Sequence, residues 1–422
     1  MKLFATIARD LADCDLRLRQ ILAEVISNDH SLRDTADIAE QWKKFILEPL
    51  SQLEGPLSRN VVVVIDALDE SGAEATRRDI LRILSARDVQ LPSSIRIVLT
   101  SRPIMDIRQP LLASQRVQAR SLDDIEAVSM ARDITHYIST TLKELGTAFS
   151  EKDLEQLAAK SNGVFEWARL ACNFLRPRFG VMPEDCFREI MSHGTGGART
   201  LLDEMYITFL KDLTQGSPLN KFHSVMRQIL WSKEPLSISA LDSMRCKFTR
   251  EEDHFPVGII LGYMASFLTG TTDLSTPVRP MHASFYDFLL DKTRSGEFFI
   301  DKADVHHELA LSSLCVMQDG LRFNICGLET SYVRNSAVAD LEKKIEKNIP
   351  LHLLYSCRFW ATHLHDSPFD TDLANHVMAT VIGENILFWM EVLGICKCIS
   401  EADRALTSAQ GWLQVSILYC TS

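Results

Sequence analysis

Three carboxylates stand close together directly after a short apolar run, and these residue types at this spacing are suited to chemistry. The run is Val61 to Ile65, five β-branched apolar residues, and the acids that follow are Asp66, Asp69 and Glu70. An unbroken run of this length predicts a parallel strand buried on both faces. Open α/β sheets place ligands at the carboxyl ends of such strands, where carboxylates hold Mg²⁺ and orient a water beside a nucleotide phosphate. The alternative is an ordinary core strand followed by an acidic turn.

The elements that would position these acids alternate between strand and helix. Residues 1–50 show helical spacing of apolar residues, and a charged helix is predicted over residues 73–87. A second strand is predicted over residues 95–100, followed by Ser101 and Arg102, and a third, short strand over residues 117–120. This order predicts a parallel sheet.

From residue 123 onward the apolar spacing predicts helices almost throughout, including one over residues 257–268. A turn-rich stretch at 270–277 and an extended segment at 278–281 follow several helices, an order that resembles a winged helix. The predicted fold class is an α/β core with a parallel sheet, followed by mostly α-helical and winged-helix-like regions. The predicted domains are an α/β core at 1–122, a helical domain at 123–198, a winged-helix-like region at 199–301 and a helical region at 302–422.

Composition excludes several classes of protein. The 422 residues carry a net charge of −11 and show no basic stripe, which argues against a nucleic-acid binder. The most apolar long stretch, 377–399, is interrupted by Glu384, Glu391 and Lys397, so no membrane span is predicted. The ten cysteines form no C-x-x-C pair, which predicts reduced thiols in an intracellular, cytoplasmic protein.

Five motifs in order along the chain resemble the NACHT family of signal-transduction NTPases, which belong to the STAND class. The resemblance is closest to the fungal NACHT proteins labelled nephrocystin-3-like in some members. The first motif is the strand and acids at 61–70, which resemble a Walker B motif with the small residue Ala67 after the first acid. The second is the sensor-like Leu99-Thr100-Ser101-Arg102-Pro103. The other three are the helical segment at 165–174, the winged-helix signature at 280–289 and the segment at 321–329.

The resemblance implies that the α/β core is of the P-loop NTPase type, with an incomplete parallel sheet. It also implies roles for five residues and a set of ligands. Asp66 would coordinate Mg²⁺, while Asp69 and Glu70 would orient or deprotonate the attacking water. Arg102 would reach the terminal phosphate, and His282 would contact bound ADP. ATP or ADP with Mg²⁺ would be the cofactors, and the partners would be other proteins, with self-assembly controlled by a moving winged helix. The alternatives are a surface ion pair for Arg102 and a core histidine bonded to backbone for His282.

The sequence departs from the family at the phosphate-binding loop. A NACHT NTPase needs the Walker A motif G-x-x-x-x-G-K-[S/T], but the only glycine in residues 1–60 is Gly55, followed by Pro56. The chain is therefore expected to begin after the position of that loop, which makes it a partial signalling module without ATP hydrolysis. Two alternatives stay open: a nucleotide-independent protein-interaction scaffold, or a truncated gene model of a full NACHT ATPase, with WD repeats in the complete protein.

Overall fold

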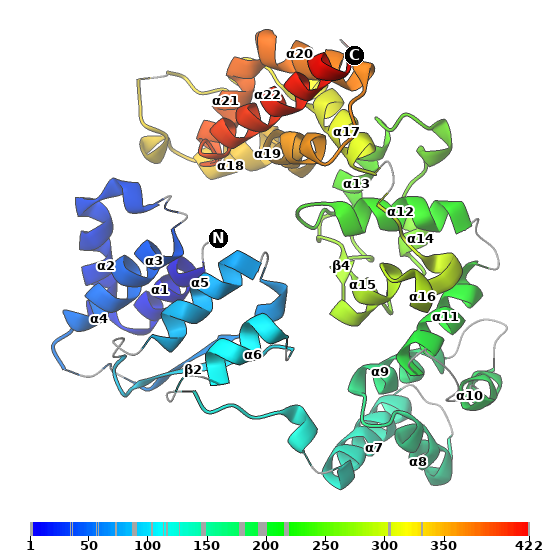
Figure 1. The fold of residues 1–422 in the computed structure, drawn as a ribbon. Helices are drawn as coiled ribbons and strands as arrows, with labels where there is room; N and C mark the ends of the chain where they lie inside the picture. Colours follow the sequence, from blue (N-terminus) through cyan, green and yellow to red (C-terminus); the bar gives the residue numbers. More distant parts are fainter. Residues whose placement is uncertain are drawn as a thin grey trace. The chain divides into compact units, whose positions relative to one another are not determined.

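The chain forms two compact units, Met1–Ile125 and Glu126–Ser422, in a computed structural model (Figure 1). Each unit is built around its own buried apolar residues. The structure describes residues 3–33, 35, 37–55, 57, 59–71, 74–86, 91–102, 104–112, 114, 117–125, 127–144, 149–176, 182–192, 201–214, 219–302, 305–330 and 332–420.

The first unit begins with helices and then alternates between strand and helix. The predicted strands and the helix between them are confirmed, each within two residues of its expected bounds. The elements are α1 (Leu3–Cys14), α2 (Leu16–Asn28), α3 (Ile38–Gln41), a π-helical stretch (Trp42–Leu47), α4 (Glu48–Ser51), β1 (Val61–Ile65), α5 (Glu74–Ser85), β2 (Ile95–Leu99) and α6 (Met105–Leu112).

Strands β1 and β2 pair in parallel, as predicted, with Val64 opposite Val98. Their inner side chains, such as Val63 and Ile97, face Phe4 of α1 across a small cavity of about 10 Å³. The prediction that this sheet is buried on both faces is wrong. Val62, Val64 and Val98 alternate with the inner residues and are exposed, because the described helices cover the opposite face.

The third strand predicted over residues 117–120 is also absent from the described residues. The backbone there forms no ladder, and only Val117 is partly buried, whereas residues 118–120 are exposed. A strand needs alternate apolar residues to pack against a core, and this tetrapeptide offers too few. The parallel sheet in the described part of the first unit therefore has two strands.

The second unit is helical apart from one short strand pair. The helices are α7 (Ala127–Glu144), α8 (Glu151–Lys160), α9 (Phe165–Phe174), α10 (Pro183–Ser192), α11 (Leu201–Thr214), α12 (Leu219–Trp231), α13 (Ile238–Arg245), α14 (Gly258–Leu261), α15 (Ala283–Leu289), α16 (Lys292–Ser295), α17 (Val305–Gly320), α18 (Leu341–Asn348), α19 (Leu351–His365), α20 (Thr371–Ile382), α21 (Asn385–Ile395) and α22 (Glu401–Cys420). The strands are β3 (Leu268–Thr269) and β4 (Arg279–Pro280), which pair antiparallel.

The extended segment predicted over 278–281 contains β4, which pairs with β3 on the other side of the stretch at 270–277, although each strand is only two residues long. The helix predicted over 257–268 is wrong beyond Leu261, because α14 ends there after one turn and Gly262 follows it. Glycine weakens a helix interior, and Gly258 and Gly262 both fall in this segment. The four-part division of the chain stays a prediction.

Within the described residues, no single helix is both long and apolar enough to cross a membrane. Only α20 and α21 taken together meet that length and composition, and the two helices are bent by 72° at the break between them.

A chain of polar groups joins α17, α19 and the segment after α12 in the second unit. The Lys233 N–H donates to the Tyr355 hydroxyl at 3.0 Å, and that hydroxyl lies 2.7 Å from His363 Nε2. The Nδ1 atoms of His363 and His306 lie 2.9 Å apart, and His306 Nε2 lies 3.7 Å from Asp366. Burial disfavours the charged form of both imidazoles, and since the two Nδ1 atoms face each other, one of them donates and the other accepts.

We expect these two histidines to make the protein less stable in mild acid. Burial lowers the pKa of both His306 and His363, and the nearby Lys233 lowers it further, although Asp366 opposes this. Protons therefore bind these two histidines more readily in the unfolded chain than in the folded one. The free energy of unfolding should be constant above pH about 6.5 and fall below it, lowering the thermal midpoint by several degrees near pH 5. Circular dichroism melts across this range measure the effect.

The double variant His306→Gln with His363→Gln should show a smaller dependence on pH than the wild type. His365→Gln is the matched control, since His365 is exposed on α19, the helix that carries His363. An unchanged pH dependence in the double variant would contradict this account of the buried pair.

Candidate functional site

The site predicted from the sequence lies where β1 and β2 end. The chain turns sharply after Asp66, because Ala67 adopts a left-handed conformation with φ 50° and ψ 52°. The turn is bonded to the end of β2: Thr100 N–H donates to Ile65 O, and Leu68 N–H donates to Thr100 O, each at 3.0 Å. Leu68 is buried beneath the turn. These contacts bring the two carboxyl ends to one edge, as expected for parallel strands.

Asp66 is held at this edge by Thr100. The Thr100 hydroxyl donates to Asp66 Oδ1 and accepts the Ala67 N–H at 2.9 Å. Asp66 is exposed, so solvent or a ligand can reach its carboxylate. Magnesium sites beside nucleotides use few protein oxygens and complete their octahedron with water and phosphate. A single accessible carboxylate beside a hydroxyl fits that pattern.

Asp69 is bound to Arg102. Its Oδ1 accepts the Arg102 N–H at 3.0 Å, and its Oδ2 accepts Arg102 Nε at 2.5 Å. The Asp69 side chain is 4% exposed, whereas that of Arg102 is 53% exposed. Burial raises the pKa of Asp69, but the hydrogen bonds and charge of Arg102 outweigh it, so this pKa lies below its usual range. A carboxylate with a lowered pKa is a weak base, which suits a structural role better than proton abstraction.

Glu70 ends the same turn and is exposed. Of the three acids, Glu70 and Asp66 are therefore open to solvent, and Asp69 is enclosed. Among the residues that the structure describes, no group of three or more histidine, cysteine, aspartate or glutamate side chains is placed to hold a metal ion. Metal binding at Asp66 thus requires a ligand that brings its own oxygens.

His282 belongs to the second unit, where it caps α15. Its Nδ1 accepts the Ser284 N–H at 3.2 Å and is also hydrogen-bonded to the Ser284 hydroxyl. That hydroxyl lies 2.7 Å from the hydroxyl of Tyr206, which is buried on α11. Since Nδ1 accepts a backbone N–H, the imidazole carries its proton on Nε2 when neutral. His282 is exposed, so it combines a helix-capping role with an accessible edge.

The structure thus brings together Asp66, Asp69, Glu70 and Arg102, and adds Thr100. Sequence analysis placed Thr100 at the end of a strand and within the sensor-like motif, but gave its side chain no role. A hydroxyl residue directly after a parallel strand, next to an acid that ends the neighbouring strand, is the signal that could have identified it. Pro103, the last residue of the sensor-like motif, lies outside the described residues.

The left-handed turn explains why a small residue follows Asp66, and it can be tested. We expect Ala67→Gly to raise the free energy of unfolding by about 0.5–1 kcal/mol, because glycine adopts positive φ without strain. Ala67→Val should lower it by about 1–2 kcal/mol, since a β-branched residue is strained there. Urea denaturation measures both changes.

The matched control for that experiment is Ala12→Gly inside α1, which should lower the free energy of unfolding by about 0.5–1 kcal/mol. If Ala67→Gly lowered the free energy of unfolding as Ala12→Gly does, the left-handed backbone would not be what restricts the residue type at position 67.

Comparison with known proteins gives one match. The model of the family described as Nephrocystin 3, N-terminal, matches residues 1–102. The match runs from the start of the chain through β2 and ends at Arg102, so it includes the whole cluster of Asp66, Asp69, Glu70 and Arg102. No curated protein matches the chain, and no solved structure matches it. Residues 1–102 are therefore similar to the N-terminal region that this family describes.

Proposed function

We propose that the first unit is a partial nucleotide-binding module of the NACHT type, and that it serves signalling through protein contacts without hydrolysing ATP. The observation that carries this proposal is the placement of Asp66 and Arg102 at the carboxyl ends of a parallel strand pair. The nephrocystin-3-like match over residues 1–102 supports it, since such a region is typical of signalling or interaction proteins.

The proposed ligand is ATP or ADP with Mg²⁺. Asp66 supplies one metal ligand, and the phosphates and waters supply the rest. Arg102 presents a half-exposed guanidinium, which binds phosphate oxygens in a planar, bidentate way. The nucleotide contact expected of His282, and the response of the winged-helix-like region to exchange of ADP for ATP, stay predictions.

Hydrolysis needs groups that this chain does not supply in the expected form. Residues 1–60 contain no G-x-x-x-x-G-K-[S/T] loop, whose backbone N–H groups and lysine hold the β- and γ-phosphates. Asp69 has a lowered pKa and is committed to Arg102. With Asp66 as the metal ligand, Glu70 is the accessible base among these acids. If no loop holds the phosphate in place, Glu70 has no fixed position from which to activate a water.

Nucleotide binding can be measured with fluorescently labelled ADP and ATP in the presence of Mg²⁺. We expect saturable binding below about 1 mM that weakens about tenfold or more in Asp66→Ala, because one metal ligand is lost. Asp10→Ala is the matched control, since Asp10 is an exposed acid on α1. Absence of saturation at about 1 mM for both nucleotides, or equal affinity in Asp66→Ala and the wild type, would refute the nucleotide-binding part of the proposal.

The same protein should release no phosphate from Mg·ATP above the rate in buffer, and Glu70→Gln should leave that result unchanged. A steady release of phosphate that is lost in Glu70→Gln would show that hydrolysis takes place and that Glu70 is its base.

A second candidate is an interaction scaffold that works without nucleotide. The observation in its favour is the ion pair between Asp69 and Arg102, which neutralises the charge that a phosphate would otherwise meet. The titration separates the two candidates: saturable binding that depends on Asp66 supports the first, and its absence supports the scaffold.

A further inference from the structure

The outer face of the β1–β2 sheet is apolar and uncovered in the first unit. Val62 and Val64 of β1 are 58% and 64% exposed, and Val98 of β2 is 47% exposed. Val64 lies directly opposite Val98 in the parallel register, and Val62 precedes Val64 by two residues on the same face. The three valines therefore form one continuous surface, which we call the valine face. Since parallel strands are normally covered on both faces, we expect a partner to cover this one.

The amino end of the valine face carries a positive charge. Arg96 lies opposite Val62 in the register and is exposed. Its guanidinium donates to two backbone carbonyl oxygens, those of Ser93 and Ile95. Among the residues that the structure describes, no carboxylate pairs with Arg96. Its charge is therefore available to a partner.

The carboxyl end of the same face carries a negative charge. Asp66 follows the last exposed valine of β1 by two residues and is itself exposed. Glu70 adds a second exposed carboxylate at this end of the sheet. Arg102 also lies at this end, but its charge is balanced by its ion pair with Asp69. The valine face is therefore positive at its amino end and negative at its carboxyl end.

We propose that the valine face binds the same face of a second copy of the chain, with the strands of the two copies running in opposite directions. This reversal brings Arg96 of each copy near Asp66 of the other, because each lies two positions from the level of the central Val64–Val98 pair. Packed sheets lie about 10 Å apart, a gap that an arginine and an aspartate side chain together can span. The two-fold symmetry places one charged pair on each side of the buried valines.

The charges distinguish this arrangement from other occupants of the valine face. Two copies with strands running in the same direction would place Arg96 beside Arg96 and Asp66 beside Asp66, which is repulsive. A helix with one sign of charge, or an anionic membrane surface, would match one end of the face and oppose the other. A reversed second copy matches both ends.

The size of the valine face sets the expected strength of the dimer. Three valines and their neighbours bury less area than a standard interface of about 1,600 Å², so we expect a dissociation constant on the order of 10–100 µM. The proposal goes beyond the function proposed above and does not rest on it, since the dimer forms in protein without nucleotide.

The test is sedimentation equilibrium of the full chain without nucleotide, over about 1–200 µM, a range that brackets the expected dissociation constant. We expect a monomer–dimer equilibrium in the wild type. Val64→Ser with Val98→Ser should weaken it about tenfold or more, because the centre of the interface loses its apolar contact. Leu16→Ser is the matched control, since Leu16 is 70% exposed at the start of α2 and should leave the dissociation constant unchanged.

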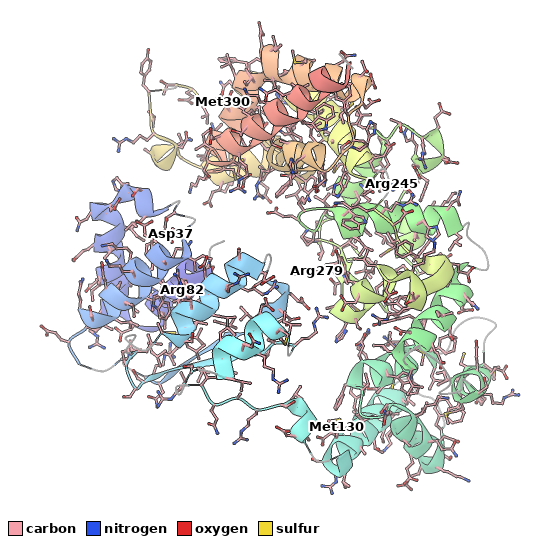
Figure 2. The ribbon with its side chains drawn as sticks, in the orientation of Figure 1. Asp37, Arg82, Met130, Arg245, Arg279 and Met390 are labelled. Atoms are coloured by element: carbon pink, nitrogen blue, oxygen red, sulfur yellow. The ribbon has the colours of Figure 1, made fainter. Side chains whose placement is uncertain are left out.

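The charged pairs have a test of their own. Arg96→Glu and Asp66→Lys should each weaken the dimer about tenfold or more, because each places like charges together on both sides of the valines. An equimolar mixture of the two variants should dimerise nearly as well as the wild type, since a mixed dimer holds two attractive pairs. Arg82→Glu is the matched control, because Arg82 is exposed on α5, where Figure 2 labels it, and should leave the dimer unchanged.

Three results would overturn the proposal. The first is a wild type that stays monomeric up to about 200 µM, which would leave the valine face to a different occupant. The second is a serine double variant that dimerises as well as the wild type. The third is a pair of charge variants that keep the dimer when separate, or that do not regain it when mixed. Circular dichroism of each variant, matched to the wild type, confirms that the protein is folded.

Discussion

The candidate site depends on the contact between the turn after β1 and the end of β2. Backbone bonds join Leu68 to Thr100 and Thr100 to Ile65, and the Asp69–Arg102 pair closes the same junction. The Asp69 carboxylate is almost fully enclosed, so removing Arg102 would leave a buried charge without compensation. A phosphate that binds Arg102 must therefore share the guanidinium with Asp69. Under the proposed function, the conformation of the turn would therefore depend on whether a phosphate is bound to Arg102.

The local features of this site could be predicted from the sequence. Val61 to Ile65 and the segment at 95–99 are β-branched or aliphatic runs, and their parallel pairing follows from the helix between them. That pairing places Asp66 and Arg102 at one edge without any further information. The partner of Asp69 could not be predicted, because which donor meets a carboxylate depends on side-chain geometry. The exposure of one face of the sheet could not be predicted either, since an apolar run does not reveal how many layers of helix cover it.

Contacts between distant segments were the hardest to predict. His306 and His363 are separated by 57 positions, yet their Nδ1 atoms meet in the core, and Tyr355 and Lys233 complete the chain of bonds. Each histidine lies in an ordinary helical pattern, so sequence spacing gave no reason to pair them. The helix expected over 257–268 failed for a local reason instead, because two glycines outweighed the apolar periodicity.

The two units differ in how they satisfy their exposed groups. At the end of β1, the Asp69 carboxylate is paired with Arg102, and the Asp66 carboxylate accepts a hydrogen bond from Thr100 while it stays exposed. On α21, by contrast, Leu387 and Met390 stay in solvent although the helix has almost no polar side to present. Removing apolar area from water is favourable by roughly 25 cal/mol per Å². Apolar side chains that stay in solvent on a folded helix are therefore suited to protein contacts, the kind of role proposed for this chain.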